Sequence, residues 1–158
     1  MPLRVHICAV GRLRSGPEKV LLDDYSERCA RTGRSLGLSS VTIHEVEDKK
    51  NGGMSSEAAL LEKAIPKGAR IVSMDERGKV VTSVEFAERL AGWRDTGTQD
   101  VAFLIGGADG LDPSLRAKAD FSLSFGKMVW PHMLARVMLS EQLYRAASIL
   151  AGSPYHRI

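Results

Sequence analysis

The chain is poor in the features that would place it in a membrane or give it a thiol-based site. No run approaches the roughly 18 consecutive apolar residues that a membrane-spanning helix needs, so we expect no membrane partner. Cysteine occurs only at Cys8 and Cys29, which fall in different predicted elements. The chain has no Cys-x-x-Cys pair, so neither a zinc knuckle nor a redox pair is indicated. We therefore expect two free, buried thiols.

The common phosphate-binding and metal-binding motifs are also missing. Residues 103–111 (FLIGGADGL) pass from an apolar run into a glycine turn, but Ala108 stands where Gly-x-Gly-x-x-Gly requires glycine. No Gly-Lys-Ser/Thr follows, which excludes a Walker loop, and neither His-x-x-His nor clustered carboxylates supply metal ligands. Gly106 and Gly107 therefore either bind a ligand such as an adenine or a ribose through backbone groups, or only form the turn after a strand.

What is present is the composition of an ordinary globular protein. The 158 residues, 44% hydrophobic and 26% charged, suffice for one domain, which we expect to span residues 1–158. Residues 1–5 lead directly into a strand-like pattern without a signal-peptide layout, so we expect a cytoplasmic location. The net charge of +3 is compatible with a polyanionic partner but does not require one.

Apolar strand patterns alternate with helical patterns along the chain. The predicted strands cover residues 3–10, 40–46, 69–74, 101–105 and 121–125, and the predicted helices cover 17–31, 55–65, 82–93, 113–119 and 131–150. We expect a turn at 75–79, and a central strand buried on both faces at 101–105, where the apolar run is continuous. The alternation predicts an α/β fold with a mostly parallel sheet flanked by helices.

The helix predicted at 131–150 is apolar around most of its circumference. Its apolar residues, among them Met133, Val137 and Leu143, leave only a narrow polar strip. Such a helix must be covered on more than one side. Its own sheet can cover one side and a second subunit the other, so we expect a homodimer.

The same helix carries two arginines with different neighbours. Arg145 lies four residues after Glu141, so a helical ion pair is its simplest interpretation. Arg136 has no acidic residue four positions before or after it, which makes it the freer candidate for a phosphate contact. The simplest interpretation of His132, at the start of the helix, is that its ring only caps the helix.

The end of the chain combines an aromatic ring, an imidazole and a guanidinium. These groups belong to Tyr155, His156 and Arg157. Chain ends are commonly frayed, so a disordered tail is the plain alternative to a functional group here.

Motifs distributed over the whole chain resemble one family. They are residues 5–11 (VHICAVG), 71–75 (IVSMD), 104–111 (LIGGADGL), 125–132 (FGKMVWPH), Arg136, 141–146 (EQLYRA) and 154–157 (PYHR). This series is similar to the RlmH family, the bacterial ribosomal RNA large-subunit methyltransferases H of the SPOUT superfamily. Several spaced motifs in order are far more specific than any one of them.

The resemblance implies an α/β fold with a deep C-terminal trefoil knot, assembled as a homodimer. It implies methyl transfer from S-adenosylmethionine to N3 of a pseudouridine in 23S ribosomal RNA, with the assembled ribosome as the substrate. The partners that we expect are therefore 23S rRNA in the ribosome and a second copy of the chain, with no DNA and no metal ion.

In such enzymes the cofactor is held in the knot, largely by backbone groups of three loops. Carried onto this chain, the cofactor-binding residues are Met74, Gly106, Phe125, Gly126, Lys127, Met128, Val129 and Trp130. The family usually has Ser and Thr where this chain has Gly126 and Val129, so hydroxyl contacts are lost there while backbone contacts remain. S-adenosylmethionine carries no phosphate, which accounts for a glycine loop without a phosphate motif.

The resemblance also places the C-terminal tail near the active site. N3 of a pseudouridine is an imide nitrogen, and it must lose its proton and lie in line with the methyl–sulfur bond. The expected catalytic residues are Tyr155 for stacking on a base, His156 as a general base, and Arg157 for a phosphate or the developing imide charge. Arg136 is the expected substrate-binding residue.

Two other functions are open at this point. One is a non-catalytic RNA-binding or ribosome-binding module that kept the fold, which a test of S-adenosylmethionine binding separates from the enzyme. The other is a small-nucleotide-binding α/β enzyme of another class. The absence of a phosphate loop and the full-length extent of the resemblance disfavour that interpretation.

Overall fold

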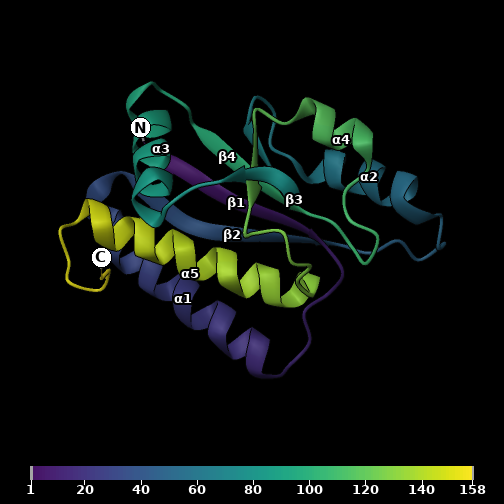
Figure 1. Cartoon of the computed structure of the whole chain (residues 1–158), viewed down its shortest axis with the longest axis horizontal. Helices are drawn as coiled ribbons and strands as arrows, with labels where there is room; N and C mark the ends of the chain where they lie inside the picture. Colours follow the sequence, from purple (N-terminus) through teal and green to yellow (C-terminus); the bar gives the residue numbers. More distant parts are fainter. Residues whose placement is uncertain (1, 158) are drawn as a thin grey trace.

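The computed structural model describes residues 2–157 as a parallel five-stranded sheet between two layers of helices (Figure 1). The elements are β1 (Leu3–Val10), α1 (Pro17–Gly33), the short 3₁₀ helix η1 (Arg34–Leu36), β2 (Leu38–Val46), α2 (Gly53–Ala64), β3 (Arg70–Val80), α3 (Ser83–Asp95), β4 (Asp100–Ile105), α4 (Pro113–Lys118), β5 (Phe121–Ser124) and α5 (His132–Leu150). The strand order is β2-β1-β4-β3-β5, and each neighbouring pair is parallel. The predicted α/β fold with a sheet flanked by helices is confirmed.

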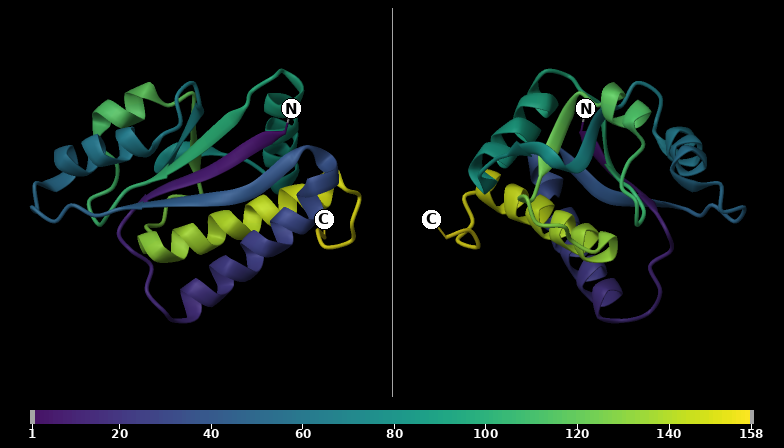
Figure 2. Two further views of the ribbon diagram at one scale, coloured as in Figure 1. Left: turned by 180° about the vertical axis from the view of Figure 1, so that it is seen from behind. Right: turned by 45° about the vertical axis from the view of Figure 1, so that its right-hand side comes forward.

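The two faces of the sheet have separate hydrophobic cores. Helices α1, α3 and α5 cover one face and α2 and α4 cover the other (Figure 2), and each group packs its own cluster of apolar side chains against the sheet. Strand β1 contributes to both because its side chains alternate: Val5 and Ile7 belong to the first core, and Cys8 and Val10 to the second. All six residues of β4 are buried, as predicted for a central strand.

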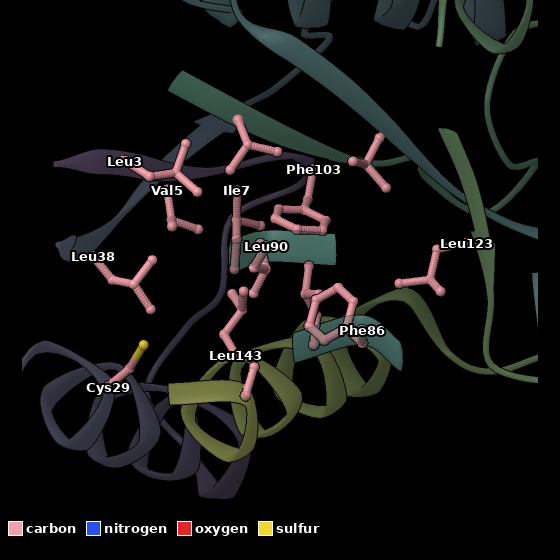
Figure 3. Close-up of a cluster of buried hydrophobic side chains, with 14 of the residues drawn as sticks. Leu3, Val5, Ile7, Cys29, Leu38, Phe86, Leu90, Phe103, Leu123 and Leu143 are labelled. Carbon is pink, nitrogen blue, oxygen red and sulfur yellow. The ribbon is translucent and has the colours of Figure 1, made fainter. Parts of the chain in front are cut away.

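Aromatic and aliphatic side chains fill the larger core (Figure 3). Phe103 of β4 meets Phe86 of α3 edge to face, with ring centroids 6.0 Å apart. Ile7, Leu90 and Leu143 bring β1, α3 and α5 into the same cluster. Each such side chain contributes roughly 1.5–3 kcal/mol on burial, so this cluster fixes α3 and α5 against the sheet.

Helix α5 is covered within its own chain. The sheet and α3 cover one side, and α1 runs alongside it on the other, where Leu22 and Val137 form a third apolar cluster with Leu13 (Figure 1). The apolar circumference of α5 therefore does not require a second subunit, and the homodimer stays a prediction that rests on the resemblance. No helix within residues 2–157 is both long and apolar enough to cross a membrane.

Two local predictions need correction. The turn predicted at 75–79 is an irregularity inside β3, where Met74 and Lys79 both align with Leu123 of β5 and the residues between them bulge out. Helix α2 begins at Gly53 without a side-chain cap, two residues before the start predicted at residue 55.

Other local signals are confirmed. The helix predicted from residue 82 begins with a capping box formed by Thr82 and Glu85, and at the start of α4 the Asp112 carboxylate accepts the Ser114 N–H at 2.9 Å. Both cysteines are free and buried, and burial raises the pKa of Cys8 to about 12 and that of Cys29 to about 11. The two thiols therefore stay protonated at neutral pH.

A buried carboxylate links the first strand to the central one. Asp100 is 7% exposed and accepts two hydrogen bonds of 2.8 Å from the Arg4 guanidinium and one of 2.8 Å from Nε2 of His6. Nδ1 of His6 lies 3.0 Å from Nε2 of His44 on β2. The hydrogen bonds from Arg4, and then that from His6, outweigh burial and lower the pKa of Asp100 to about 2.

We expect Asp100→Asn to lower the free energy of unfolding by about 2 kcal/mol at pH 7. The folded-state pKa of Asp100 lies below its unfolded value of 3.8, so this stability is present above pH 4 and is lost as the pH falls through 2. Urea unfolding at pH 7 and at pH 3 should therefore show a smaller difference between variant and wild type at pH 3. Asp95→Asn is the matched control, because Asp95 pairs with Arg94 at the surface and should change stability by less than about 0.5 kcal/mol. A difference for Asp100→Asn that does not vary with pH would contradict the assignment.

Candidate functional site

The bulge in β3 and the loops after β4 and β5 surround a cavity of about 670 Å³ at the carboxyl edge of the sheet. The three strands are neighbours in the sheet, so the segments that follow them meet at one edge. The lining comes from Met74, Asp75, Glu76 and Arg77, from residues 105–111, from Leu123, Phe125 and Gly126, from residues 128–132, and from Ala135. This volume and position are typical of a small-molecule site.

Glycine is required at the loop after β4 because the backbone folds back on itself. A Cβ added to Gly106 would lie 2.4 Å from the carbonyl carbon of Gly110, and Gly110 has a φ of 82°. The turn is closed by the Gly110 N–H, which donates to the carbonyl of Gly107 at 3.0 Å. The glycines therefore do form the turn, and they also line the cavity with backbone atoms.

The loop at residues 125–130 is held at its start and exposed further on. The hydroxyl of Ser124 accepts the N–H of Gly126 at 3.0 Å and lies 3.1 Å from the carbonyl of Glu76, which ties β5 to the β3 bulge. Gly126 has a φ of 112°, so the glycine suits this left-handed backbone. Met128 and Val129 are 76% and 81% exposed, so two apolar side chains stand at the edge of the cavity without cover.

The structure brings together nearly all of the residues expected to bind a cofactor. Met74, Gly106, Phe125, Gly126, Met128, Val129 and Trp130 line the cavity, whereas Lys127 is exposed and lies outside its lining. The sequence prediction missed Asp75, Glu76 and Arg77 in the β3 bulge, and it missed His132. Their positions in the sequence could have indicated them, because they follow predicted strands or loops that reach the same edge of the sheet.

Carboxylates predominate among the charged groups of the cavity. Among the residues that the structure describes, Asp75, Glu76 and Asp109 line it together with one cation, Arg77, and Asp75 pairs with Arg77 at 3.4 Å and with Arg116 at 3.5 Å. Asp75 also receives the backbone N–H of Arg77 at 3.0 Å, which shapes the bulge. With Asp75 engaged by these two arginines, Glu76 and Asp109 are the carboxylates that favour a ligand with a positive charge. In the part of the chain from residue 2 to residue 157, no three His, Cys, Asp or Glu side chains are grouped so as to hold a metal ion.

Arg136 corrects the expectation of a free guanidinium. Its side chain is fully buried, and Nη1 pairs with the Glu45 carboxylate of β2 at 2.8 Å. Nη2 donates to the carbonyls of Gly11 at 3.1 Å and Val10 at 3.3 Å, at the end of β1. Glu45 lies 91 residues before Arg136 in the sequence, so residues at helical spacing from Arg136 could not reveal this ion pair. In this conformation Arg136 clamps the start of α5 to the sheet and presents no charge to a phosphate.

The C-terminal tail is packed rather than frayed. The Tyr155 hydroxyl donates to the Glu141 carboxylate at 2.6 Å, and its ring lies 4.5 Å from that of Tyr144. Burial, followed by the bond to Glu141, raises the pKa of Tyr155. Arg145 makes the predicted ion pair with Glu141 at 2.7 Å and reaches Nδ1 of His156 at 3.1 Å.

Within one chain the tail and the cavity lie at opposite ends of α5 (Figure 1). The helix has 19 residues, which at 1.5 Å per residue separates its ends by about 28 Å. The structure therefore does not bring Tyr155, His156 and Arg157 to the cavity of their own chain. A catalytic role for these three residues therefore requires the tail of one chain to reach the cavity of another.

Comparisons with known proteins agree over nearly the whole length. Residues 3–156 match a family model described as a predicted SPOUT methyltransferase. The chain is 70% identical over 156 residues to the "Ribosomal RNA large subunit methyltransferase H" of Ruegeria sp. (strain TM1040), covering 99% of this chain and 100% of that protein. It is 64% identical over 155 residues to the protein of the same name from Paracoccus denitrificans, covering 98% and 99%.

A solved structure supports the fold alone. The chain is similar to a probable methylase family protein from Haemophilus influenzae Rd KW20, with a TM-score of 0.52 at 13% identity. The likeness covers 99% of this chain and 70% of that one.

We expect Gly106→Ala to disrupt the cavity, because the added methyl group would overlap the backbone of Gly110. The thermal midpoint should fall, and amide exchange in residues 106–111 should become faster. The control is Gly92→Ala in the last turn of α3, where nothing lies within 4 Å of an added Cβ and alanine is the better helix former. That substitution should stabilise the protein by up to about 1 kcal/mol. Equal effects of the two substitutions would show that the close approach at Gly106 does not constrain the loop.

Proposed function

The chain belongs to the SPOUT methyltransferase family and, within it, to the ribosomal RNA large subunit methyltransferases H, and from this membership we propose that it methylates large-subunit ribosomal RNA with S-adenosylmethionine as the methyl donor. The observation that carries the proposal is the identity of 64–70% to relatives of that name, matched over their full length. The finer proposal is methylation of N3 of a pseudouridine in 23S rRNA, on the assembled ribosome in the cytoplasm.

The residues around the cavity fit such a methyl donor. S-adenosylmethionine carries an electrophilic methyl group on a sulfonium cation, and the carboxylates of Glu76 and Asp109 favour a cation. The glycines at 106, 107, 110 and 126 leave backbone groups open to an adenosine moiety without a phosphate motif. Trp130 is 41% exposed at the cavity and offers an aromatic face on which a base can stack.

The reaction makes limited demands on the protein. The imide nitrogen has to be positioned in line with the methyl–sulfur bond, and holding two reactants in this geometry lowers the barrier substantially. A rigid cavity serves this purpose, and here Ser124 ties the end of β5 to the bulge in β3. Exclusion of water by the apolar residues 128–130 would strengthen the electrostatic contacts inside.

The position of the tail supports a composite site in a homodimer. One chain holds the cavity at one end of α5 and the tail at the other, about 28 Å apart. We infer that Tyr155, His156 and Arg157 act at the cavity of the partner chain, which makes the second copy part of the active site. The trefoil knot belongs to the same proposal, since the segments at Met74, Gly106 and Phe125 are those that the resemblance assigns to it.

The deciding experiment measures transfer of labelled methyl groups from S-adenosylmethionine to ribosomes from a strain that lacks this modification, followed by mapping of the labelled nucleotide. Label on N3 of a pseudouridine in 23S rRNA is the expected result, and free rRNA and isolated subunits show which form is the substrate. Label on another base would overturn the finer proposal. Failure of calorimetry to detect S-adenosylmethionine binding at millimolar ligand would favour a non-catalytic RNA-binding module.

We predict that deletion of residues 155–158 abolishes methyl transfer but leaves S-adenosylmethionine binding intact, because the tail is remote from the cavity of its own chain. Co-refolding the deleted chain with Gly106→Ala chains should restore part of the activity, since a mixed dimer joins an intact cavity to an intact tail. Each variant refolded alone is the control. Full activity of the truncated protein would remove the tail from the mechanism, and absence of complementation would argue against a site shared between chains.

A further inference from the structure

Two buried polar atoms without hydrogen-bond partners lie on successive turns at the start of α5. They are Nδ1 of His132 and Nε of Arg136, and among residues 2–157 neither has a donor or acceptor in reach. The two residues are four positions apart, so their side chains share one face of the helix. His132 also lines the cavity, which places an unpaired imidazole nitrogen beside the proposed active site.

The surroundings of His132 favour one tautomer of its ring. Arg136 is held by Glu45 and by the carbonyls of Gly11 and Val10, and its Nε always carries a hydrogen. Beside this cation a lone pair on Nδ1 is favoured over an N–H, so the hydrogen belongs on Nε2. Burial and then the charge of Arg136 lower the pKa of His132, which keeps the ring neutral.

The ring is also held in place on its other side. A Cβ at Gly11 would lie 3.5 Å from Cε1 of His132 and 3.3 Å from the terminal methyl group of Met133. The loop after β1 that Arg136 clamps is therefore the surface on which the imidazole packs. With Nδ1 buried in this way, the open edge of the ring is the one that carries Nε2.

We propose that His132 contacts the bound ligand and donates a hydrogen bond from Nε2 to an oxygen atom of that ligand. Arg136 fixes the tautomer that makes this donation possible. The proposal rests on the function proposed above. The acceptor is either a carbonyl oxygen of the target base, where charge accumulates once the imide is deprotonated, or an oxygen of the methyl donor. His132 keeps its proton in this role, so it differs from the general base expected of His156. Within one chain His156 lies beside Arg145 at the far end of α5.

Three substitutions at His132 test the contact, because the amide nitrogens of glutamine and asparagine replace different ring nitrogens. Gln places a donor near Nε2, Asn places one near Nδ1, and Leu has none. We expect His132→Leu and His132→Asn to lose about 10–10²-fold in methyl transfer or in donor affinity, and His132→Gln to stay within a few-fold of wild type. His44→Gln, on β2 outside the cavity lining, is the control and should leave both unchanged.

The measurements separate the two acceptors. A lower kcat at unchanged S-adenosylmethionine affinity in calorimetry indicates the target base, whereas weaker affinity at unchanged kcat indicates the methyl donor. Equal losses in Gln, Asn and Leu variants, accompanied by equal falls in thermal midpoint, would reduce His132 to a structural residue and overturn the inference. Wild-type kinetics in all three variants would overturn it as well.

A second measurement does not depend on activity. Long-range ¹H–¹⁵N spectra of the ¹⁵N-histidine-labelled protein report the tautomer directly, and we expect His132 to carry its proton on Nε2. A proton on Nδ1 would overturn the inference even if the enzyme were active. Failure of the wild type to methylate rRNA would count against the proposed function, while the tautomer would still decide the arrangement at His132.

Discussion

The site depends on one buried cation. Arg136 is fully enclosed, and removing a guanidinium from water is costly unless its hydrogen bonds are replaced. The replacements come from Glu45 on β2 and from the carbonyls at the end of β1, so two strands and α5 are joined at a single point. Glu45 also accepts the N–H of Leu13 at 2.6 Å, which draws the loop after β1 into the same arrangement. The start of α5, and with it one wall of the cavity, is positioned by this network.

The sheet order determines the rest of the site. Strands β4, β3 and β5 are adjacent, so three segments that are separate in the sequence reach one edge and surround the cavity. The same geometry sends α5 away from that edge toward the opposite end of the molecule (Figure 2). Within one chain α5 holds the cavity and the tail apart, and this separation is the reason that the proposed composite site includes a second copy of the chain.

Features controlled by near neighbours in the sequence could be predicted. The capping box at Thr82 and Glu85, the Asp112 cap and the buried strand β4 all depend on residues a few positions apart. The cofactor loops were located through resemblance to a family, since a glycine turn alone does not distinguish a ligand site from a simple turn. Seven of the eight expected residues do line the cavity.

What could not be predicted depends on distant partners. The pairing of Arg136 with Glu45 spans 91 residues, and helical spacing pointed instead to a free side chain. The cover over α5 comes from α1, a helix more than a hundred residues earlier, and the sequence pattern could not tell it from a second subunit. His132 looked like a helix cap because its burial beside Arg136 and against Gly11 exists only in the folded chain.

The glycines of the cavity have a consequence for how this protein tolerates mutation. Four lining residues, Gly106, Gly107, Gly110 and Gly126, have no side chain to lose. Their contribution can be damaged only by adding atoms, and at Gly106 there is no room for even one carbon. Substitution by alanine, the usual way to find important residues, removes side-chain atoms elsewhere, but at these glycines it adds a methyl group. At Gly110 and Gly126 an added Cβ would meet nothing within 4 Å, and there the positive φ of the backbone is what disfavours a side chain.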